Sequence, residues 1–155
     1  MSPTPGVGFG RGRRQPVRTD DRTRKEDVVS EDLSCKDDLF CGVNVPADPE
    51  AMTDLERKHL PVITAPKTVK KGECFEVTVE VGKLLAHPNE PGHFIEFVEL
   101  YADETFLGRA DLTAVKTCPT VTLCVALDHA HKELRAYERC NLHGVWKAAK
   151  PITVQ

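Results

Sequence analysis

Residues 75–81 read Phe-Glu-Val-Thr-Val-Glu-Val, and this alternation is the clearest structural signal in the chain. Apolar side chains fall at every second position and are separated by Glu and Thr. Period-two alternation is typical of a β-strand with one face in the core and the other toward water. The same pattern returns at residues 121–127, so we predict a second strand of the same kind there.

Further strands are predicted around these two. The candidates are residues 61–65, 93–101, 105–112, 133–139 and 151–154, with turn residues between them. Within residues 93–101 the alternation shifts at Val98, Glu99 and Leu100, which predicts a β-bulge. About seven short strands without a long helix between them predict an all-β fold, an antiparallel β-sandwich.

The composition excludes several classes of protein. Of the 155 residues, 40% are hydrophobic and 29% are charged, which is typical of neither a disordered nor a membrane-embedded chain. No apolar run is long enough to span a bilayer, so we expect no membrane partner. The net charge of −3 argues against a nucleic-acid partner.

The charge is unevenly distributed and suggests three parts. The first thirty residues carry seven basic and four acidic side chains, which is +3, so the remainder carries −6. We predict a flexible basic tail at residues 1–32, a linker at residues 33–54 and the main domain at residues 55–155. Arg13 and Arg14 are not followed by the apolar stretch that an export signal requires. We therefore expect a cytoplasmic location, where structural disulfides are rare.

The linker is predicted to contain a short helix. Asp48 is the expected N-cap, with Pro49 in the first helical turn, and the helix should end before Pro61. Cys35 and Cys41 also lie in the linker. They are interpreted either as two ordinary thiols or as a redox-active pair.

The six histidines and six cysteines are the residues most suited to chemistry. His59, His87, His93, Cys140 and His143 lie where predicted strands begin or end, which is where a sandwich usually carries its sites. Four imidazoles and one thiolate on a single metal would form a square base with an axial sulfur, unlike tetrahedral structural zinc. Such a centre would keep a sixth position open, which suits the reduction of a small oxygen species.

The remaining histidines and cysteines are given structural roles. His129 and His131 lie in a polar turn and are predicted to be the exposed surface of a hairpin. Cys74 and Cys124 lie within predicted strands and Cys118 precedes one, and we expect them to pack in the sandwich as small hydrophobic groups.

Three blocks of sequence resemble one known family. Residues 58–63 read KHLPVI, residues 87–93 read HPNEPGH, and residues 140–146 read CNLHGVW. In order and spacing they are similar to the blocks of the neelaredoxin-type superoxide reductases, which share their catalytic domain with desulfoferrodoxin. The resemblance covers roughly residues 50–155.

This resemblance implies a seven-stranded immunoglobulin-like sandwich with a mononuclear non-haem iron. The reaction implied is the one-electron reduction of superoxide to hydrogen peroxide, with rubredoxin or a similar small protein as electron donor, in a dimer or tetramer. Lys58 would attract superoxide and help to organise water for protonation, Asn141 would hold the metal turn, and Trp146 would shield it. The implied iron ligands are His59, His87, His93 and His143 in the equatorial plane and Cys140 on the axis.

The sequence departs from the family pattern at three points. Arg57 stands where a glutamate usually precedes the lysine and caps the oxidised iron, and Glu56 lies one residue earlier. Phe94 stands where a second histidine is common. Only Cys35 and Cys41 precede the main domain, so the four-cysteine iron centre of desulfoferrodoxin is expected to be absent. Two other functions stay open: an electron-transfer or metal-sensing iron protein, and an interaction domain in which metal is incidental.

Overall fold

The computed structural model describes residues 38–155. The predicted tail, Cys35 and the first residues of the linker lie outside this range. Within it, no helix is long and apolar enough to cross a membrane. The elements are β1 (Val43–Asn44), α1 (Asp54–His59), β2 (Val62–Thr64), β3 (Thr68–Val69), β4 (Cys74–Glu80), β5 (Ile95–Ala102), β6 (Thr105–Asp111), β7 (Thr120–Ala126), β8 (Glu133–Cys140), β9 (Gly144–Pro151) and β10 (Thr153–Val154).

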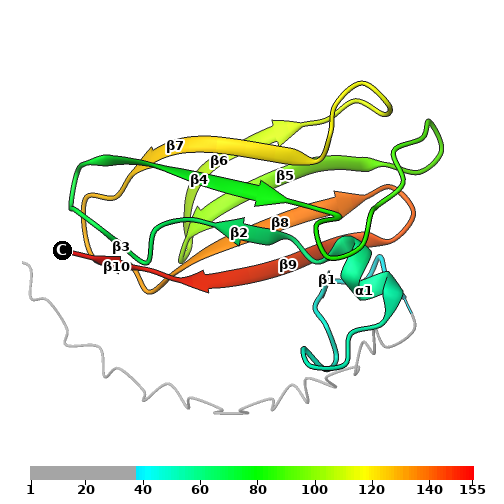
Figure 1. The fold of residues 1–155 in the computed structure, drawn as a ribbon, viewed down its shortest axis with the longest axis horizontal. Helices are drawn as coiled ribbons and strands as arrows, with labels where there is room; N and C mark the ends of the chain where they lie inside the picture. Colours follow the sequence, from blue (N-terminus) through cyan, green and yellow to red (C-terminus); the bar gives the residue numbers. More distant parts are fainter. Residues whose placement is uncertain (1–37) are drawn as a thin grey trace, which may run out of the picture. The chain divides into compact units, whose positions relative to one another are not determined.

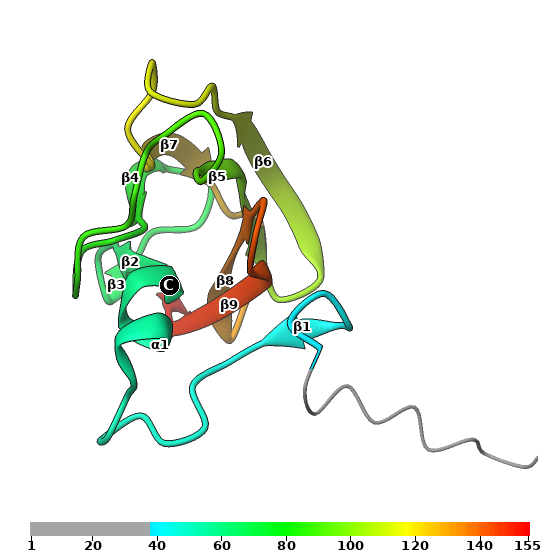
Figure 2. The same cartoon turned by 90° about the vertical axis from the view of Figure 1, so that its right-hand side faces the viewer.

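Two sheets form a β-sandwich, as the sequence predicts (Figures 1 and 2). One sheet has the strand order β1-β9-β8-β5-β6 and the other has the order β2-β4-β7. Figure 2 views the strands nearly end-on and shows the two sheets facing each other. All pairings in these sheets are antiparallel except β1 with β9, and the short strands β3 and β10 form a separate parallel pair.

The core follows the alternation seen in the sequence. Val77 and Val79 of β4 are buried and pack with residues such as Leu100 and Leu134 from the facing sheet. The intervening side chains of β4 and β7 point outward, and Thr78 and Thr122 face each other there with their hydroxyls 2.8 Å apart. Burial of the inward rows supplies the main force holding the two sheets together.

The expectation that three cysteines pack in the core is wrong. Cys74, Cys118 and Cys124 are all exposed. Cys74 and Cys124 occupy the outward positions of β4 and β7, so the parity of the strand overrides the tendency of cysteine to be buried. Cys41 is disulfide-bonded, so the expectation that structural disulfides are rare does not hold at this residue.

Strand β9 is absent from the sequence-based prediction. The segment Gly144–Pro151 is rich in Ala and Lys, which have low strand propensity, yet it pairs with β8 along its whole length. The predicted strand at 151–154 is only the two-residue β10. Apart from the two-residue strands β1, β3 and β10, the described residues form seven strands of three or more residues, which is the predicted number. Strand β9 takes the place of the strand predicted at residues 151–154.

The short helix starts later than predicted. Its N-cap is Thr53, whose hydroxyl accepts from the backbone N–H of Glu56, while the Glu56 carboxylate accepts from the backbone N–H of Thr53. This reciprocal capping box starts the helix at Asp54, so Asp48 is not its cap. The bulge predicted at Val98–Leu100 is not found there, since these residues pair without a break. The shift between Leu100 and Tyr101 leaves the extra residue, Leu107, on β6, and β5 itself has its extra residue at Glu96, opposite β8.

Candidate metal centre

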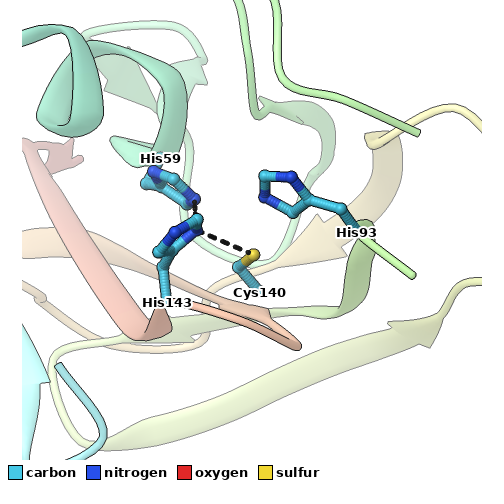
Figure 3. Close-up of side chains that lie close together, drawn as sticks. All are labelled: His59, His93, Cys140 and His143. Carbon is cyan, nitrogen blue, oxygen red and sulfur yellow. Dashed lines mark hydrogen bonds between the residues drawn. The ribbon is translucent and has the colours of Figure 1, made fainter. Parts of the chain in front are cut away.

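Three segments converge at one end of the sandwich. His59 is the last residue of α1, His87 and His93 lie on the loop between β4 and β5, and Cys140 and His143 flank the turn between β8 and β9. Figure 3 shows His59, His93, Cys140 and His143 pointing toward one another. Ligand atoms of these four residues lie within 4.8 Å of one another, and His87 joins the cluster through His59.

The four imidazoles lie at the corners of a near-square. In the order His59, His87, His93, His143, the ring centroids of successive neighbours are 4.7, 4.7 and 4.9 Å apart, and His143 is 4.7 Å from His59. The His59–His93 diagonal is 6.4 Å. A square has a diagonal about 1.4 times its side, whereas all separations in a tetrahedron are equal. The arrangement is therefore close to a square base and unlike a structural zinc site.

The rings of His59 and His87 face each other through nitrogens that carry no proton. Nδ1 of His59 donates to the Leu55 carbonyl at 2.7 Å, and Nδ1 of His87 donates to the Pro88 carbonyl at 2.6 Å. Each ring is then left with a lone pair on Nε2, and these two Nε2 atoms are 3.1 Å apart. Two lone pairs at this distance repel each other unless a cation lies between them.

His93 and His143 complete this pattern. Nε2 of His93 is buried and has no hydrogen-bond partner among residues 38–155. Nδ1 of His143 is 3.1 Å from Nε2 of His59 and 3.5 Å from the sulfur of Cys140. The donor set of this centre is therefore three Nε2 atoms, one Nδ1 atom and one sulfur. Such a set fits a transition-metal ion, because each of these atoms offers a lone pair once deprotonated and one is a buried nitrogen without a hydrogen-bond partner.

The turn that carries Cys140 is tied to the loop that carries His93. The Asn141 side chain accepts from the Phe94 N–H and donates to the Gly92 carbonyl, both at 2.9 Å. Gly144 closes the turn with a φ of +72°, and a Cβ there would lie 1.9 Å from the Leu39 carbonyl oxygen. The prediction that Asn141 holds the turn is therefore correct, and the asparagine also fixes the loop that carries His93.

Trp146 covers the His59 side of the cluster. Its indole stacks on the His59 ring with centroids 5.3 Å apart, and its N–H donates to the His143 carbonyl at 2.9 Å. Trp146 is 2% exposed and His59 is completely buried. The indole excludes water from this side, as predicted.

Burial favours the neutral form of three of these imidazoles. Burial first, and then the neighbouring charges, lower the pKa of both His59 and His87 to about 4, although each Nδ1 hydrogen bond opposes the shift. The pKa of His143 is also lowered, first by burial and then by the charges of His93 and Lys58. Neutral imidazole is the form that binds metals, so these rings are ready to act as ligands near neutral pH.

The Cys140 thiol is held by opposing influences. Burial raises its pKa, while hydrogen bonds from the backbone N–H groups of Leu142 and His143 lower it. Hydrogen bonds of this kind stabilise the thiolate form, and an adjacent metal cation would add to them.

The residues before His59 have distinct positions. The Glu56 carboxylate accepts hydrogen bonds from the Thr53 N–H and the Ala47 N–H, which together lower its pKa, so it serves the helix start. Arg57 contacts the Leu84 carbonyl and, at 4.0 Å, Asp54. Lys58 is half-buried, and its charge acts on His87 and His143. Of these side chains, Lys58 is the cation with an electrostatic effect on the cluster.

Two residues differ from their sequence-based interpretation or were missed by it. His129 is exposed as predicted, but His131 is buried, because its ring is held against Asp103. Glu138 of β8 was not singled out, although it is completely buried and two positions before Cys140. The inward parity it shares with Cys140 could have identified it.

Fold and cluster together define the class of protein, an all-β sandwich with a His/Cys centre at one end. Comparison with known proteins agrees. The desulfoferrodoxin family model matches residues 51–149. A desulfoferrodoxin from Nitratidesulfovibrio vulgaris is 35% identical, over 76% of this chain and 79% of that protein, and a superoxide reductase from Pyrococcus abyssi is 37% identical, over 58% and 83%.

A solved structure has the same fold. The neelaredoxin-type superoxide reductase from Ignicoccus hospitalis is 35% identical and superposes with a TM-score of 0.64, covering 73% of this chain and 95% of that one. The chain therefore belongs to the desulfoferrodoxin family, and it is an oxidoreductase.

Proposed function

We propose that this protein reduces superoxide to hydrogen peroxide at a mononuclear non-haem iron. The observation that carries the proposal is the near-square of four imidazoles with a thiol beside it, in which Nε2 of His59 and Nε2 of His87 face each other as lone-pair donors. Relatives named superoxide reductase support the choice of substrate. The one from Pyrococcus abyssi is 37% identical, and the match covers 83% of its length.

The proposed ligands match the residues that the sequence predicts. A donor set of imidazoles with one thiolate suits iron, copper or zinc. Zinc has no redox chemistry, so a one-electron reduction points to a redox metal, and the family favours iron. The ligands proposed are Nε2 of His59, His87 and His93, Nδ1 of His143 and the sulfur of Cys140.

The chain's own residues then have separate roles. Bound iron would supply one electron to superoxide, which takes up two protons to become hydrogen peroxide. Lys58 provides local positive charge, which attracts an anion to a chain whose net charge is −3. The Cys140 thiolate would hold the iron and donate electron density to it, and the N–H groups of Leu142 and His143, which hydrogen-bond the sulfur, would tune that donation. Trp146 keeps water from the His59 side.

The capping role of Glu56 leaves the sixth position without that carboxylate. Its two oxygens accept hydrogen bonds from the backbone N–H groups of Ala47 and Thr53. The residue directly before Lys58 is Arg57, which cannot replace a carboxylate. We propose that this position is open to small exogenous anions. The electron donor is proposed to be rubredoxin or a similar small protein, the protein a homo-oligomer, and its location cytoplasmic.

The test is metal analysis together with the absorption spectrum after oxidation. We expect one iron per chain and a thiolate-to-iron absorption band. Cys140→Ser should abolish both this band and superoxide reduction, because the sulfur ligand is gone. Cys118→Ser is the matched control, since Cys118 is an exposed free thiol outside the centre, and it should change neither.

Two results would overturn the proposal. One is a chain that binds no iron when produced in iron-rich medium. The other is full activity in Cys140→Ser with its circular dichroism unchanged. If iron and the absorption band are present but azide does not perturb the spectrum, the position is closed, and an electron-transfer role replaces superoxide reduction.

A further inference from the structure

A second cluster of metal-type side chains lies in the hairpin between β7 and β8. Asp128, His129 and His131 each offer a ligand atom, and these atoms lie within 4.8 Å of one another. The two imidazole centroids are 4.2 Å apart. The cluster therefore brings two nitrogens and a carboxylate together on a turn of only a few residues.

His131 is the anchored member of this cluster. Its side chain is only 3% exposed, and its Nδ1 lies 3.2 Å from the Asp103 carboxylate. Asp103 also accepts from the backbone N–H groups of Lys132 and Glu133, so the carboxylate is fixed against the hairpin. A histidine whose Nδ1–H donates to a carboxylate presents Nε2 in a fixed direction and with raised basicity, as in metal sites.

Asp103 lies in the two-residue turn between β5 and β6 with a φ of +49°. Tight hairpin turns require such left-handed positions, which Asp tolerates better than most residues. Its carboxylate contacts the neighbouring hairpin, where it holds His131.

His129 and Asp128 supply the exposed side of the cluster. Nδ1 of His129 is 2.6 Å from one oxygen of Asp128. For both residues to bind one ion, Nδ1 of His129 and an oxygen of Asp128 would be the ligand atoms, with the ion taking the place of the proton between them. Two imidazoles and one carboxylate, with water in a fourth position, form a donor set that zinc and other borderline divalent ions accept.

This cluster is separate from the first centre. Strand β8 begins at Glu133, next to the hairpin, and ends at Cys140. Eight residues of extended strand span roughly 25 Å, so the two clusters lie at opposite ends of the strand. Figure 1 shows the β7–β8 connection at the end of the sandwich away from α1.

We propose that Asp128, His129 and His131 form a second metal site, which binds a divalent transition-metal ion of the zinc type, and that Asp103 positions His131 for it. Metal binding would join the exposed end of the hairpin to the buried histidine. The site does not depend on the iron chemistry proposed above.

The test is zinc binding by the full-length, iron-loaded protein. After equilibration with buffered micromolar Zn²⁺, we expect the wild-type chain to retain one zinc more than His129→Ala, which is an exposed position and should not disturb folding. The zinc dissociation constant should rise at least about tenfold in His129→Ala and about 10- to 100-fold in Asp103→Asn. Lys132→Ala, in the same hairpin, is the control and should bind as the wild type does.

A spectroscopic readout accompanies the zinc count. Co²⁺ substituted for Zn²⁺ should give a visible ligand-field band in the wild type that is lost in His129→Ala. Any metal exchange at the first centre is common to both proteins and cancels in the difference. Equal zinc retention and equal Co²⁺ spectra in the wild type and His129→Ala would overturn the proposal.

Discussion

Replacing Glu138 with Gln should flatten the dependence of folding stability on pH above neutrality. Glu138 lies on β8, is completely buried, and neither of its carboxylate oxygens has a hydrogen-bond partner within residues 38–155. Burial of the charged form raises its pKa from 4.5 to about 9. The folded chain therefore keeps a proton on Glu138 that the unfolded chain releases.

The magnitude follows from proton linkage. Between the unfolded pKa of 4.5 and the folded pKa of about 9, the native state binds one more proton than the unfolded state. The stability contributed by this group is present below the lower value and is lost as the pH rises, at about 1.4 kcal/mol per pH unit. From about pH 7 to about pH 8.5, the wild type should lose about 2 kcal/mol through this group alone.

The assay is urea unfolding of chelator-treated protein at several pH values in this window. Glu138→Gln has no titrating carboxyl here, so its free energy of unfolding should fall by about 2 kcal/mol less than that of the wild type. Glu76→Gln is the matched control, because Glu76 is exposed on β4, and it should retain the wild-type slope. Parallel curves for wild type and Glu138→Gln would refute the reasoning and indicate that the carboxylate is solvated or paired.

Three further predictions concern the first centre. Lys58→Ala should slow the reaction with superoxide several-fold at low ionic strength and flatten its salt dependence, whereas Lys70→Ala, far from the centre, should do neither; an unchanged salt dependence would exclude Lys58 as the steering charge. Thr53→Ala should lower the free energy of unfolding in urea by about 1 kcal/mol and speed the release of iron, because the capping box starts the helix that ends at His59. An unchanged free energy of unfolding would mean that the cap is dispensable. The free energy of unfolding of the metal-free chain should decrease as the pH falls from about 6.5 to about 4, because His59 and His87 take up protons more readily in the unfolded chain. A free energy of unfolding that is constant across this window would contradict their lowered pKa values.

Much of the fold could be predicted because the alternation of inward and outward side chains along a strand can be seen in a few consecutive residues. The alternation in residues 75–81 places every second side chain in the core, and β4 buries Val77 and Val79 as expected. The same alternation places Cys74 outward. The expectation that Cys74 is buried was wrong because it followed the general tendency of cysteine to be buried and not the position of this residue in the strand. Strand β9 lacks a local signal, because its Ala- and Lys-rich sequence becomes a strand through pairing with β8.

By itself, the sequence determined the set of residues at the first centre, since the spacing of three short blocks resembles one family and each block supplies ligand-type side chains. Only the tertiary structure decided their arrangement as a near-square, because the rings come from separate segments. Local hydrogen bonds to the Leu55 and Pro88 carbonyls orient His59 and His87, but the packing of the segments, including the contacts of Asn141 with the loop that carries His93, sets the positions of the rings. The tertiary structure also decided that His131 is buried, because its partner Asp103 lies apart along the chain and reaches it through packing. The Thr53–Glu56 capping box, by contrast, is a local pattern, and only the further contact of Glu56 with Ala47 depends on how the chain folds back.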